Sequence, residues 1–134
     1  MYISYFLVGL DCKYFSHTKL CYSLNLASTT WDDARRSCQG VIGVNGDLAT
    51  IADQETMDFI AKNFELEGDT WFGGEKVLGE WKWADGTLWN YTNWDSEEPD
   101  NDDATYLRPN NEGWYDYHKT YNSHHYICQY SFIL

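Results

Sequence analysis

The spacing of apolar residues predicts a helix in the first third of the chain. Trp31, Ala34 and Cys38 recur at steps of three and four, which places them on one face of a helix spanning residues 31–38. The Ser-Thr-Thr sequence at 28–30 precedes this segment, and hydroxyl side chains there can accept hydrogen bonds from free backbone N–H groups. We therefore expect a capped helix whose apolar face joins the core.

A second amphipathic segment begins at Asp53, the expected N-cap, and continues from Gln54 to Asn63. Its apolar positions follow i, i+3, i+4, i+7 spacing and are assigned to the core: Met57, Ile60, Ala61 and Phe64. The chain therefore contains two predicted helices.

Beyond Gly68 the helical spacing gives way to short aromatic runs separated by glycines, which are typical of β-strands. Trp81 and Trp83 alternate with a lysine and are expected on one face of a strand. The segments at 1–10 and 125–134 are apolar and rich in β-branched and aromatic residues. We predict that both are strands and that they pair with each other, which would close the domain.

Residues 88–116 show little regular pattern, and a long irregular segment in a compact domain is usually functional when it is ordered. Six carboxylates fall within nine residues of this region: Asp95, Glu97, Glu98, Asp100, Asp102 and Asp103. Two like charges about 4 Å apart repel by roughly 4 kcal/mol at an effective dielectric constant near 20, so a counter-cation would stabilise a compact loop. Oxygen ligands without nearby Cys or His favour Ca²⁺ over Mg²⁺ or Zn²⁺. The alternative is a solvated acidic loop without an ion.

The composition indicates one folded domain over residues 1–134 and excludes several classes of partner. Aromatic residues make up 18% of the chain, which argues against disorder despite a formal net charge of −12. This charge repels nucleic acid and anionic membrane surfaces. No stretch reaches the roughly 18 to 20 apolar residues of a membrane span, so membrane insertion is not expected.

Four cysteines, at positions 12, 21, 38 and 128, lack the close pairs and His partners of a zinc site. An even count in a small chain favours two disulfides and an oxidising compartment, and the alternative is buried free thiols in a cytosolic protein. Of the three possible connectivities, Cys12 with Cys21 and Cys38 with Cys128 makes a local hairpin and a long staple.

A series of short motifs runs along the chain: Cys21-Tyr22, Trp31-x-x-Ala34-x-x-x-Cys38, Gly46-Asp-Leu-Ala-Thr-Ile51, Glu55 with Phe59, Trp71-Phe-Gly-Gly74, Trp83-Ala-Asp-Gly86, Trp94, Glu98-Pro-Asp100, Trp114-Tyr-Asp116 and Tyr126-Ile-Cys128. Each motif is weak alone, but the ordered set, from Cys12 to Gln129, resembles the C-type lectin-like domain. The resemblance implies an α+β fold with two helices flanking two small antiparallel sheets and a long loop region. Cys12 and Cys21 resemble the additional cysteine pair of the family's long form.

The resemblance also implies a Ca²⁺ site in the long loop region. Lectins of this family bind the ion through Glu-Pro-Asn, a following acidic residue, and an Asn-Asp pair that follows a Trp. The matching ligands in this chain are Glu98, Asp100, Asp102 and Asp116, with Asp103 in reserve. The proline between the first two is expected to follow a cis peptide, as is typical of the family.

Two features of this site depart from the family pattern. Tyr115 stands where the family has an Asn ligand, and a neutral phenol is a poor Ca²⁺ ligand. The Glu-Pro-Asp tripeptide combines mannose-type Glu-Pro-Asn with galactose-type Gln-Pro-Asp, so both sugar classes remain open. An exposed ring that stacks on galactose would favour the second class, and Trp114, Tyr115 or Tyr117 could supply it. The residues expected to contact the ligand are Glu98, Asp100, Asp102, Trp114, Tyr115 and Asp116.

The second core disulfide of the family is absent, because its aligned positions are Ala104 and a residue near His118 or Lys119. We therefore expect the loop to be held by metal binding or by the packing of its tryptophans: Trp89, Trp94 and Trp114.

These features predict a secreted, non-enzymatic lectin that binds vicinal hydroxyls of a carbohydrate through one Ca²⁺ ion. A single shallow sugar site binds weakly, so a homo-oligomer is expected, with the terminal strands as its interface. The alternative is a C-type lectin-like module that binds a protein, ice or a mineral surface and has no sugar activity. Asn90-Tyr91-Thr92 is, in addition, an acceptor sequon for N-glycosylation.

Overall fold

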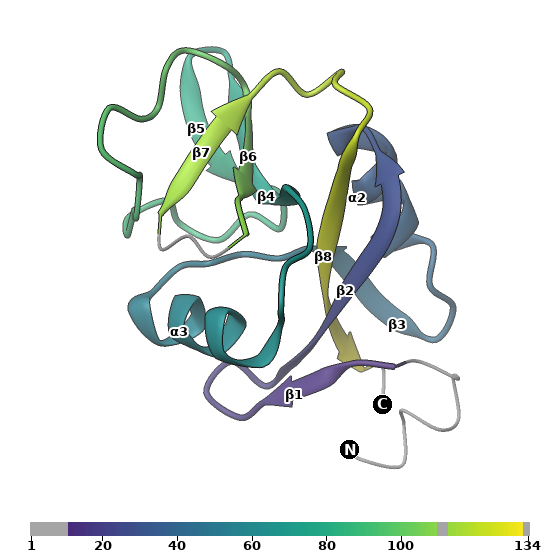
Figure 1. Cartoon of the computed structure of the whole chain (residues 1–134). Helices are drawn as coiled ribbons and strands as arrows, with labels where there is room; N and C mark the ends of the chain where they lie inside the picture. The colour runs from purple at the N-terminus through teal and green to yellow at the C-terminus, as the bar shows by residue number, and fades with distance from the viewer. Residues whose placement is uncertain (1–10, 110–112, 133–134) are drawn as a thin grey trace.

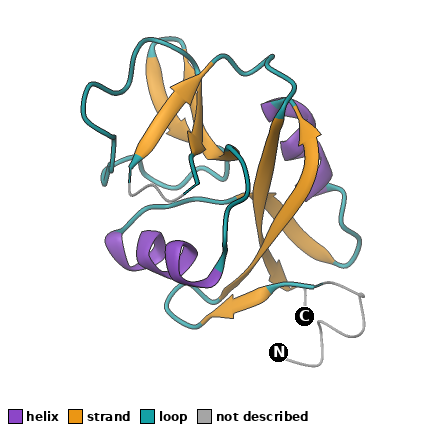
Figure 2. Ribbon diagram, in the orientation of Figure 1, coloured by secondary structure: helices purple, strands orange, loops and turns teal. Residues whose placement is uncertain are grey.

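The computed structural model describes residues 11–109 and 113–132. The strand predicted at 1–10, its predicted pairing, and the last two residues of the predicted C-terminal strand lie outside the described residues. Within them the chain forms two helices and eight strands (Figures 1 and 2). The elements are β1 (Lys13–Phe15), β2 (Leu20–Thr29), α2 (Trp31–Gln39), β3 (Val44–Leu48), α3 (Gln54–Asn63), β4 (Thr70–Val77), β5 (Glu80–Trp83), β6 (Ala104–Leu107), β7 (Trp114–Tyr117) and β8 (His124–Phe132).

The strands form two antiparallel groups that meet where β4 contacts β8 (Figure 1). In one group β8 pairs with β2 and β3, and β1 pairs with β2. In the other group β4 pairs with β5 and β6, and β7 pairs with β6. A short parallel pairing of Thr70 with His125 and of Trp71 with Tyr126 joins the groups. The predicted α+β fold is confirmed, and this pairing links its two small sheets into one hydrogen-bonded path.

Helix α2 forms where the 31–38 pattern predicts it. The Thr30 hydroxyl accepts a hydrogen bond from the Asp33 N–H at 3.2 Å, which identifies Thr30 as the N-cap among the three candidates. The Trp31 indole N–H donates to the carbonyl of Phe72 on β4 at 2.7 Å. The buried face consists of the predicted residues: Trp31, Ala34 and Cys38. The helix is therefore fixed to the sheet by both packing and a buried hydrogen bond.

Helix α3 has the predicted bounds, but one residue assigned to its core is wrong. A carboxylate oxygen of Asp53 accepts from the Thr56 N–H at 2.8 Å and caps the helix. Thr56, Met57 and Ile60 are buried, whereas Ala61 is exposed. At about 100° per residue, Thr56 and Ile60 lie on one side of Met57 and Ala61 lies on the other. The helix turns the first side to the core and leaves position 61 in solvent.

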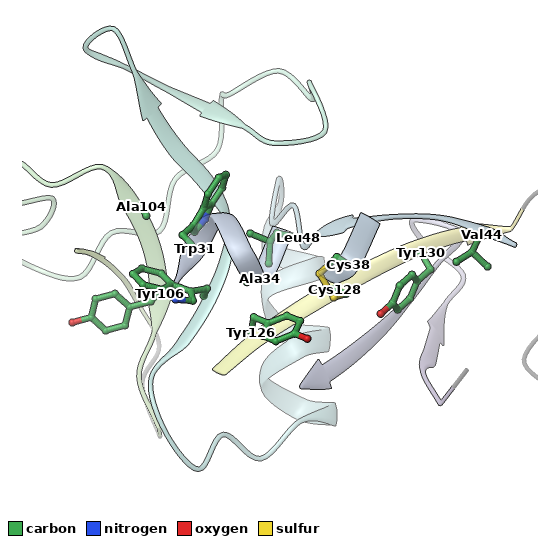
Figure 3. Packing of buried hydrophobic residues seen from close by; sticks show 11 residues of the cluster. Trp31, Ala34, Cys38, Val44, Leu48, Ala104, Tyr106, Tyr126, Cys128 and Tyr130 are labelled. Atoms are coloured by element: carbon green, nitrogen blue, oxygen red, sulfur yellow. A yellow bond between two sulfur atoms is a disulfide. The ribbon is translucent and has the colours of Figure 1, made fainter. Parts of the chain in front are cut away.

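The core consists of two clusters of buried side chains. The first brings α2, β3 and β8 together around a disulfide between Cys38 and Cys128, as Figure 3 shows. The second contains residues of α3 and of β4 to β7, including Trp83 and Trp114. The other disulfide joins Cys12 to Cys21, so the predicted pairing of one short-range and one long-range disulfide is confirmed.

A connection centred on Lys119 holds the end of the long loop region, close to the place of the missing family disulfide. The Lys119 N–H donates to the Asp103 carboxylate at 2.8 Å, and its carbonyl accepts from the Trp31 N–H at 3.1 Å. Its ammonium group lies 2.6 Å from a carboxylate oxygen of Glu75 and 3.7 Å from one of Asp32. Burial opposes the charge of the lysine, but the hydrogen bond and charge of Glu75, together with the charges of Asp32 and Asp103, outweigh burial and raise the pKa of Lys119. One side chain therefore links the loop to α2 and β4.

We expect Lys119→Met to lower the free energy of unfolding by about 1 to 3 kcal/mol, because Glu75 would stay largely buried without its partner. Methionine keeps most of the apolar stem of the lysine, so the change isolates the charge. Denaturant unfolding followed by circular dichroism measures the loss. Lys62→Met, at an exposed position of α3, is the matched control. Equal stability of the two variants would contradict the role assigned to Lys119.

Candidate functional site

The acidic loop of the long loop region turns back on itself at Pro99. The peptide between Glu98 and Pro99 is cis, as expected. Glu97 and Asn101, on either side of the tripeptide, have φ angles of 73° and 85°. Few residues other than glycine adopt this left-handed region, and asparagine is among those that tolerate it best. The two reversals bring the carboxylates of Glu98 and Asp100 to the same site on β7.

Asp116 on β7 organises this site. Only 3% of Asp116 is exposed, and its two carboxylate oxygens accept hydrogen bonds from the backbone N–H groups of Asp100 (2.8 Å) and Asp102 (2.7 Å). Its own N–H donates to a carboxylate oxygen of Glu98 at 3.2 Å. Glu98, Asp100 and Asp116 each place one oxygen within 4.8 Å of the others. One buried carboxylate thus folds the loop against β7 and assembles a group of three carboxylates.

The remaining acidic residues of the loop lie outside this group. Asp102 is held at its backbone by Asp116, but its carboxylate is not part of the three-carboxylate group. Asp103 accepts the Lys119 N–H, so its carboxylate has a structural role and is not a reserve ligand in this arrangement. The structure therefore brings together three of the four predicted ligands and leaves the fourth beside them.

The three carboxylates have unequal proton affinities. Burial, followed by contacts with Asp116 and Asp100, raises the pKa of Glu98 to about 7. Contact with Asp116 raises the pKa of Asp100, and burial raises that of Asp102. Burial also opposes the charge on Asp116, but the N–H groups of Asp100 and Asp102 donate to it and lower its pKa. The group therefore shares a proton near neutral pH, and a bound dication would take the place of that proton.

This donor set fits Ca²⁺. Three carboxylates carry about six hard oxygen atoms, and Ca²⁺ takes six to eight oxygen ligands, some of them water or ligand hydroxyls. The group contains no nitrogen or sulfur donor, which disfavours zinc. Burial is the main reason for the raised pKa of Glu98, and the neighbouring charges of Asp100 and Asp116, which a dication would offset, raise it further.

Trp114 cannot contact a sugar, so this predicted ligand contact is wrong. Its side chain is fully buried and packs edge-on against Phe72 and Trp83, with ring centroids 5.3 and 5.5 Å apart. The physical reason is strand alternation, because Trp114 and Asp116 share the inner face of β7. The indole of Trp114 packs in the core, whereas the carboxylate of Asp116 belongs to the three-carboxylate group.

Tyr115 lies on the face of β7 opposite to Asp116. Its ring stacks on that of Tyr106 with centroids 5.6 Å apart, and the Arg108 guanidinium lies 3.9 Å from the ring centroid. Burial, with Asp95 nearby, raises the pKa of Tyr115 and keeps the phenol neutral. Tyr117 is half-buried on the same face as Tyr115. Sequence reasoning missed Arg108, because only the pairing of β6 with β7 places it over this ring.

A second group with possible metal ligands contains His17, Asp53 and Glu55, again with donor atoms within 4.8 Å of one another. One oxygen of Asp53 caps α3, and the other lies 2.8 Å from a ring nitrogen of His17. We interpret this group as an ion pair that fastens the β1–β2 hairpin to α3.

Comparison with known proteins identifies the family. The family model described as Lectin C-type domain matches residues 27–130. The chain belongs to this family. Members of the C-type lectin family are generally non-catalytic, and they typically bind Ca²⁺, although some do not. No helix in the described part of this lectin domain is long and apolar enough to cross a membrane.

Similar proteins include both sugar-binding and other members. The C-type lectin lectoxin-Lio3 of Erythrolamprus poecilogyrus is 37% identical over 95 residues, covering 66% of this chain and 57% of the relative. The galactose-specific lectin nattectin of Thalassophryne nattereri is 32% identical over 90 residues, covering 63% and 55%. The chain thus matches little more than half the length of these relatives.

Two solved structures resemble this lectin domain over most of its length. The lectin domain of murine dendritic cell inhibitory receptor 2, in complex with N-glycan, superposes with a TM-score of 0.76 at 25% identity and covers 89% of this chain and 94% of its own. A calcium-independent type II antifreeze protein superposes with a TM-score of 0.74 at 28% identity, covering 92% and 95%. The fold is therefore shared by a domain in complex with N-glycan and by a calcium-independent antifreeze protein.

The pKa of Glu98 predicts a pH dependence for the metal-free lectin domain. Because the pKa rises from its ordinary value of 4.5 to about 7 on folding, the folded state binds more protons than the unfolded chain between these values. Stability contributed by this group is therefore lost as the pH rises from about 4.5 to about 7. With Ca²⁺ present we expect the reverse, because the ion displaces the proton and binds more tightly at higher pH.

Thermal melts at pH 5 and pH 7.5, with EDTA or with Ca²⁺, measure both trends. Glu98→Gln removes this titrating group, so the variant should lose less stability than the wild type between pH 5 and pH 7.5 in EDTA. Buried His124, whose pKa burial lowers to about 4, contributes a change of the opposite sign in both proteins. Glu97→Gln, one residue away and outside the group, should keep the wild-type response. An unchanged pH response in the Glu98 variant would assign the effect to other carboxylates.

Proposed function

We propose that this domain is a secreted lectin that binds carbohydrate through one Ca²⁺ ion held by Glu98, Asp100 and Asp116, with Asp102 beside them as the fourth ligand. The main support for the proposal is that three carboxylates lie close together, and that backbone N–H groups of the acidic loop donate hydrogen bonds to one of them, buried Asp116. Two disulfides, and the similarity to the lectins lectoxin-Lio3 and nattectin, support secretion and sugar binding.

The side chains of Glu98 and Asp100 define what the sugar must offer. Both are acceptors when ionised and neither is an amide donor, so a pair of vicinal hydroxyls can donate to them while its oxygens complete the Ca²⁺ shell. Mannose-type and galactose-type residues both carry such pairs. Since a single shallow contact of this kind is weak, we also propose that several copies of the domain act together as a homo-oligomer.

A glycan array with and without Ca²⁺ tests the proposal. Wild-type protein should bind glycans only with Ca²⁺ present, and Glu98→Gln and Asp100→Asn should lose this binding. Glu97→Gln keeps the same net charge as Glu98→Gln and should bind like the wild type. Signals that persist in EDTA, or that survive in both ligand variants, would contradict a Ca²⁺-dependent sugar site.

Two observations support a second candidate function. Tyr115 replaces the family's Asn ligand and is engaged by Arg108, and a calcium-independent antifreeze protein shares the fold. The second candidate is a module that binds a protein, ice or a mineral surface without sugar activity. An array without Ca²⁺-dependent hits, together with no binding of Ca²⁺ in calorimetry, would favour this function.

A further inference from the structure

The N-glycosylation sequon Asn90-Tyr91-Thr92 lies in the irregular segment between β5 and β6, outside the acidic loop. Asn90 and Thr92 are both exposed, as an acceptor asparagine and its hydroxyl partner must be. No other Asn-x-Ser/Thr sequence with a permitted middle residue occurs in the chain. The calcium site does not use this segment, so the sequon requires a separate explanation.

An aromatic groove lies next to this sequon. It has a volume of about 410 Å³ and is lined on one side by β5 and on the other by the segment that ends at Trp89, the residue before Asn90. Trp81 and Trp89 are half-buried and stack with ring centroids 5.8 Å apart and an interplanar angle of 19°. Trp83 is buried behind them, and 78% of Leu88 is exposed at the rim.

The lining of the groove combines apolar and polar groups in a way that suits a sugar ring. The indole of Trp81 and the side chain of Leu88 present apolar surface, whereas Glu80, Lys82 and Thr87 supply hydrogen-bonding groups. A pyranose has one face of C–H groups and a rim of hydroxyls, and N-acetylglucosamine adds an amide. The groove volume also falls in the range of roughly 300 to 1,000 Å³ that is usual for small-molecule sites.

We propose that Asn90 carries an N-linked glycan and that the first N-acetylglucosamine of this glycan occupies the groove of Trp81, Trp89 and Leu88. The covalent bond to Asn90 would hold this sugar next to Trp89, and therefore at a high effective concentration near the groove. Burial of the exposed leucine and indole surface would then stabilise the folded domain. The proposal rests on secretion by a eukaryotic cell and shares no residue with the calcium site.

Intact mass of the protein secreted from eukaryotic cells, before and after treatment with peptide-N-glycosidase, tests the modification. The wild type should lose the mass of one glycan and gain about 1 Da, as Asn90 becomes aspartate. Asn90→Gln and Thr92→Ala should carry no glycan, whereas the matched variant Thr92→Ser keeps the sequon and should carry one. Secreted wild-type protein without glycan mass would overturn the proposal, even if calcium-dependent sugar binding were intact.

A graded trimming experiment tests the groove. Protein with high-mannose glycans is cut by an endoglycosidase that leaves only the first N-acetylglucosamine, or by peptide-N-glycosidase, which leaves none. The single sugar should preserve the Tm of the full glycoprotein, and its removal should lower the Tm by about 2 to 5 °C. In glycosylated Trp81→Ala the Tm difference between these forms should vanish. Equal Tm values of the wild-type forms would overturn the occupancy of the groove.

Discussion

Replacing Asp116 by alanine is expected to weaken Ca²⁺ binding by more than about 100-fold. Residues that only orient a metal ligand typically cost 10- to 100-fold when removed, and Asp116 both orients Asp100 and offers an oxygen of its own. The substitution would also leave the N–H groups of Asp100 and Asp102 without their acceptor. Calorimetric titration with CaCl₂ measures the loss directly.

Thermal stability provides an independent measurement of the same site. For the wild type, Ca²⁺ at 100 times its dissociation constant should stabilise the fold by about 2.7 kcal/mol. Asp116→Asn keeps an oxygen that can accept one backbone N–H, so it should fold while losing this Ca²⁺-dependent gain. Glu97→Gln should keep the gain. A wild type with equal Tm in Ca²⁺ and in EDTA would contradict the proposed site.

Replacing both cysteines of the Cys38–Cys128 bridge by alanine is expected to lower the free energy of unfolding by about 4 to 5 kcal/mol. The bridge joins positions 90 residues apart and therefore restricts the unfolded chain strongly. Both cysteines are also buried in the core cluster between α2 and β8, so their removal costs packing as well. Denaturant unfolding of the double variant measures the loss.

The Cys12–Cys21 bridge is the matched control for this prediction. It closes a separation of only 9 positions, for which the same chain-entropy relation predicts roughly 2 to 3 kcal/mol. The ratio of the two losses therefore tests the entropic explanation. Equal losses in the two double variants would assign the stabilisation to local packing and not to loop length.

The helices show how far local patterns determine this fold. Helix α3 has the expected bounds and α2 extends one residue past them, to Gln39, because cap chemistry and apolar spacing act within a few residues. The apolar spacing places Ala61 in the core, but this residue is exposed. The spacing alone does not specify which side of α3 faces the rest of the protein. That orientation depends on the elements that pack against the helix, which lie far away in the chain.

The three-carboxylate group is predicted by the sequence only in part, for a related reason. Motif order located Glu98, Asp100 and Asp116, because the family pattern states side-chain identity at each position. The bonds that hold the loop come from backbone N–H groups of Asp100 and Asp102, and backbone donors have no signature in a sequence. The motif also does not show that Trp114 faces the core, so the sugar contact expected from the sequence is wrong.

Residue identity at short or ordered spacing is enough to predict the family, the two helices and the acidic loop. It also marks Ala104 and the residues near Lys119 as lacking the family's second bridge. By contrast, the link that Lys119 makes between the loop, α2 and β4, and the group of three carboxylates around Asp116, become visible only in the folded chain. These contacts join residues as close as 14 positions apart and as distant in the chain as Trp31 and Lys119, and only the folded chain brings such residues into hydrogen-bonding range.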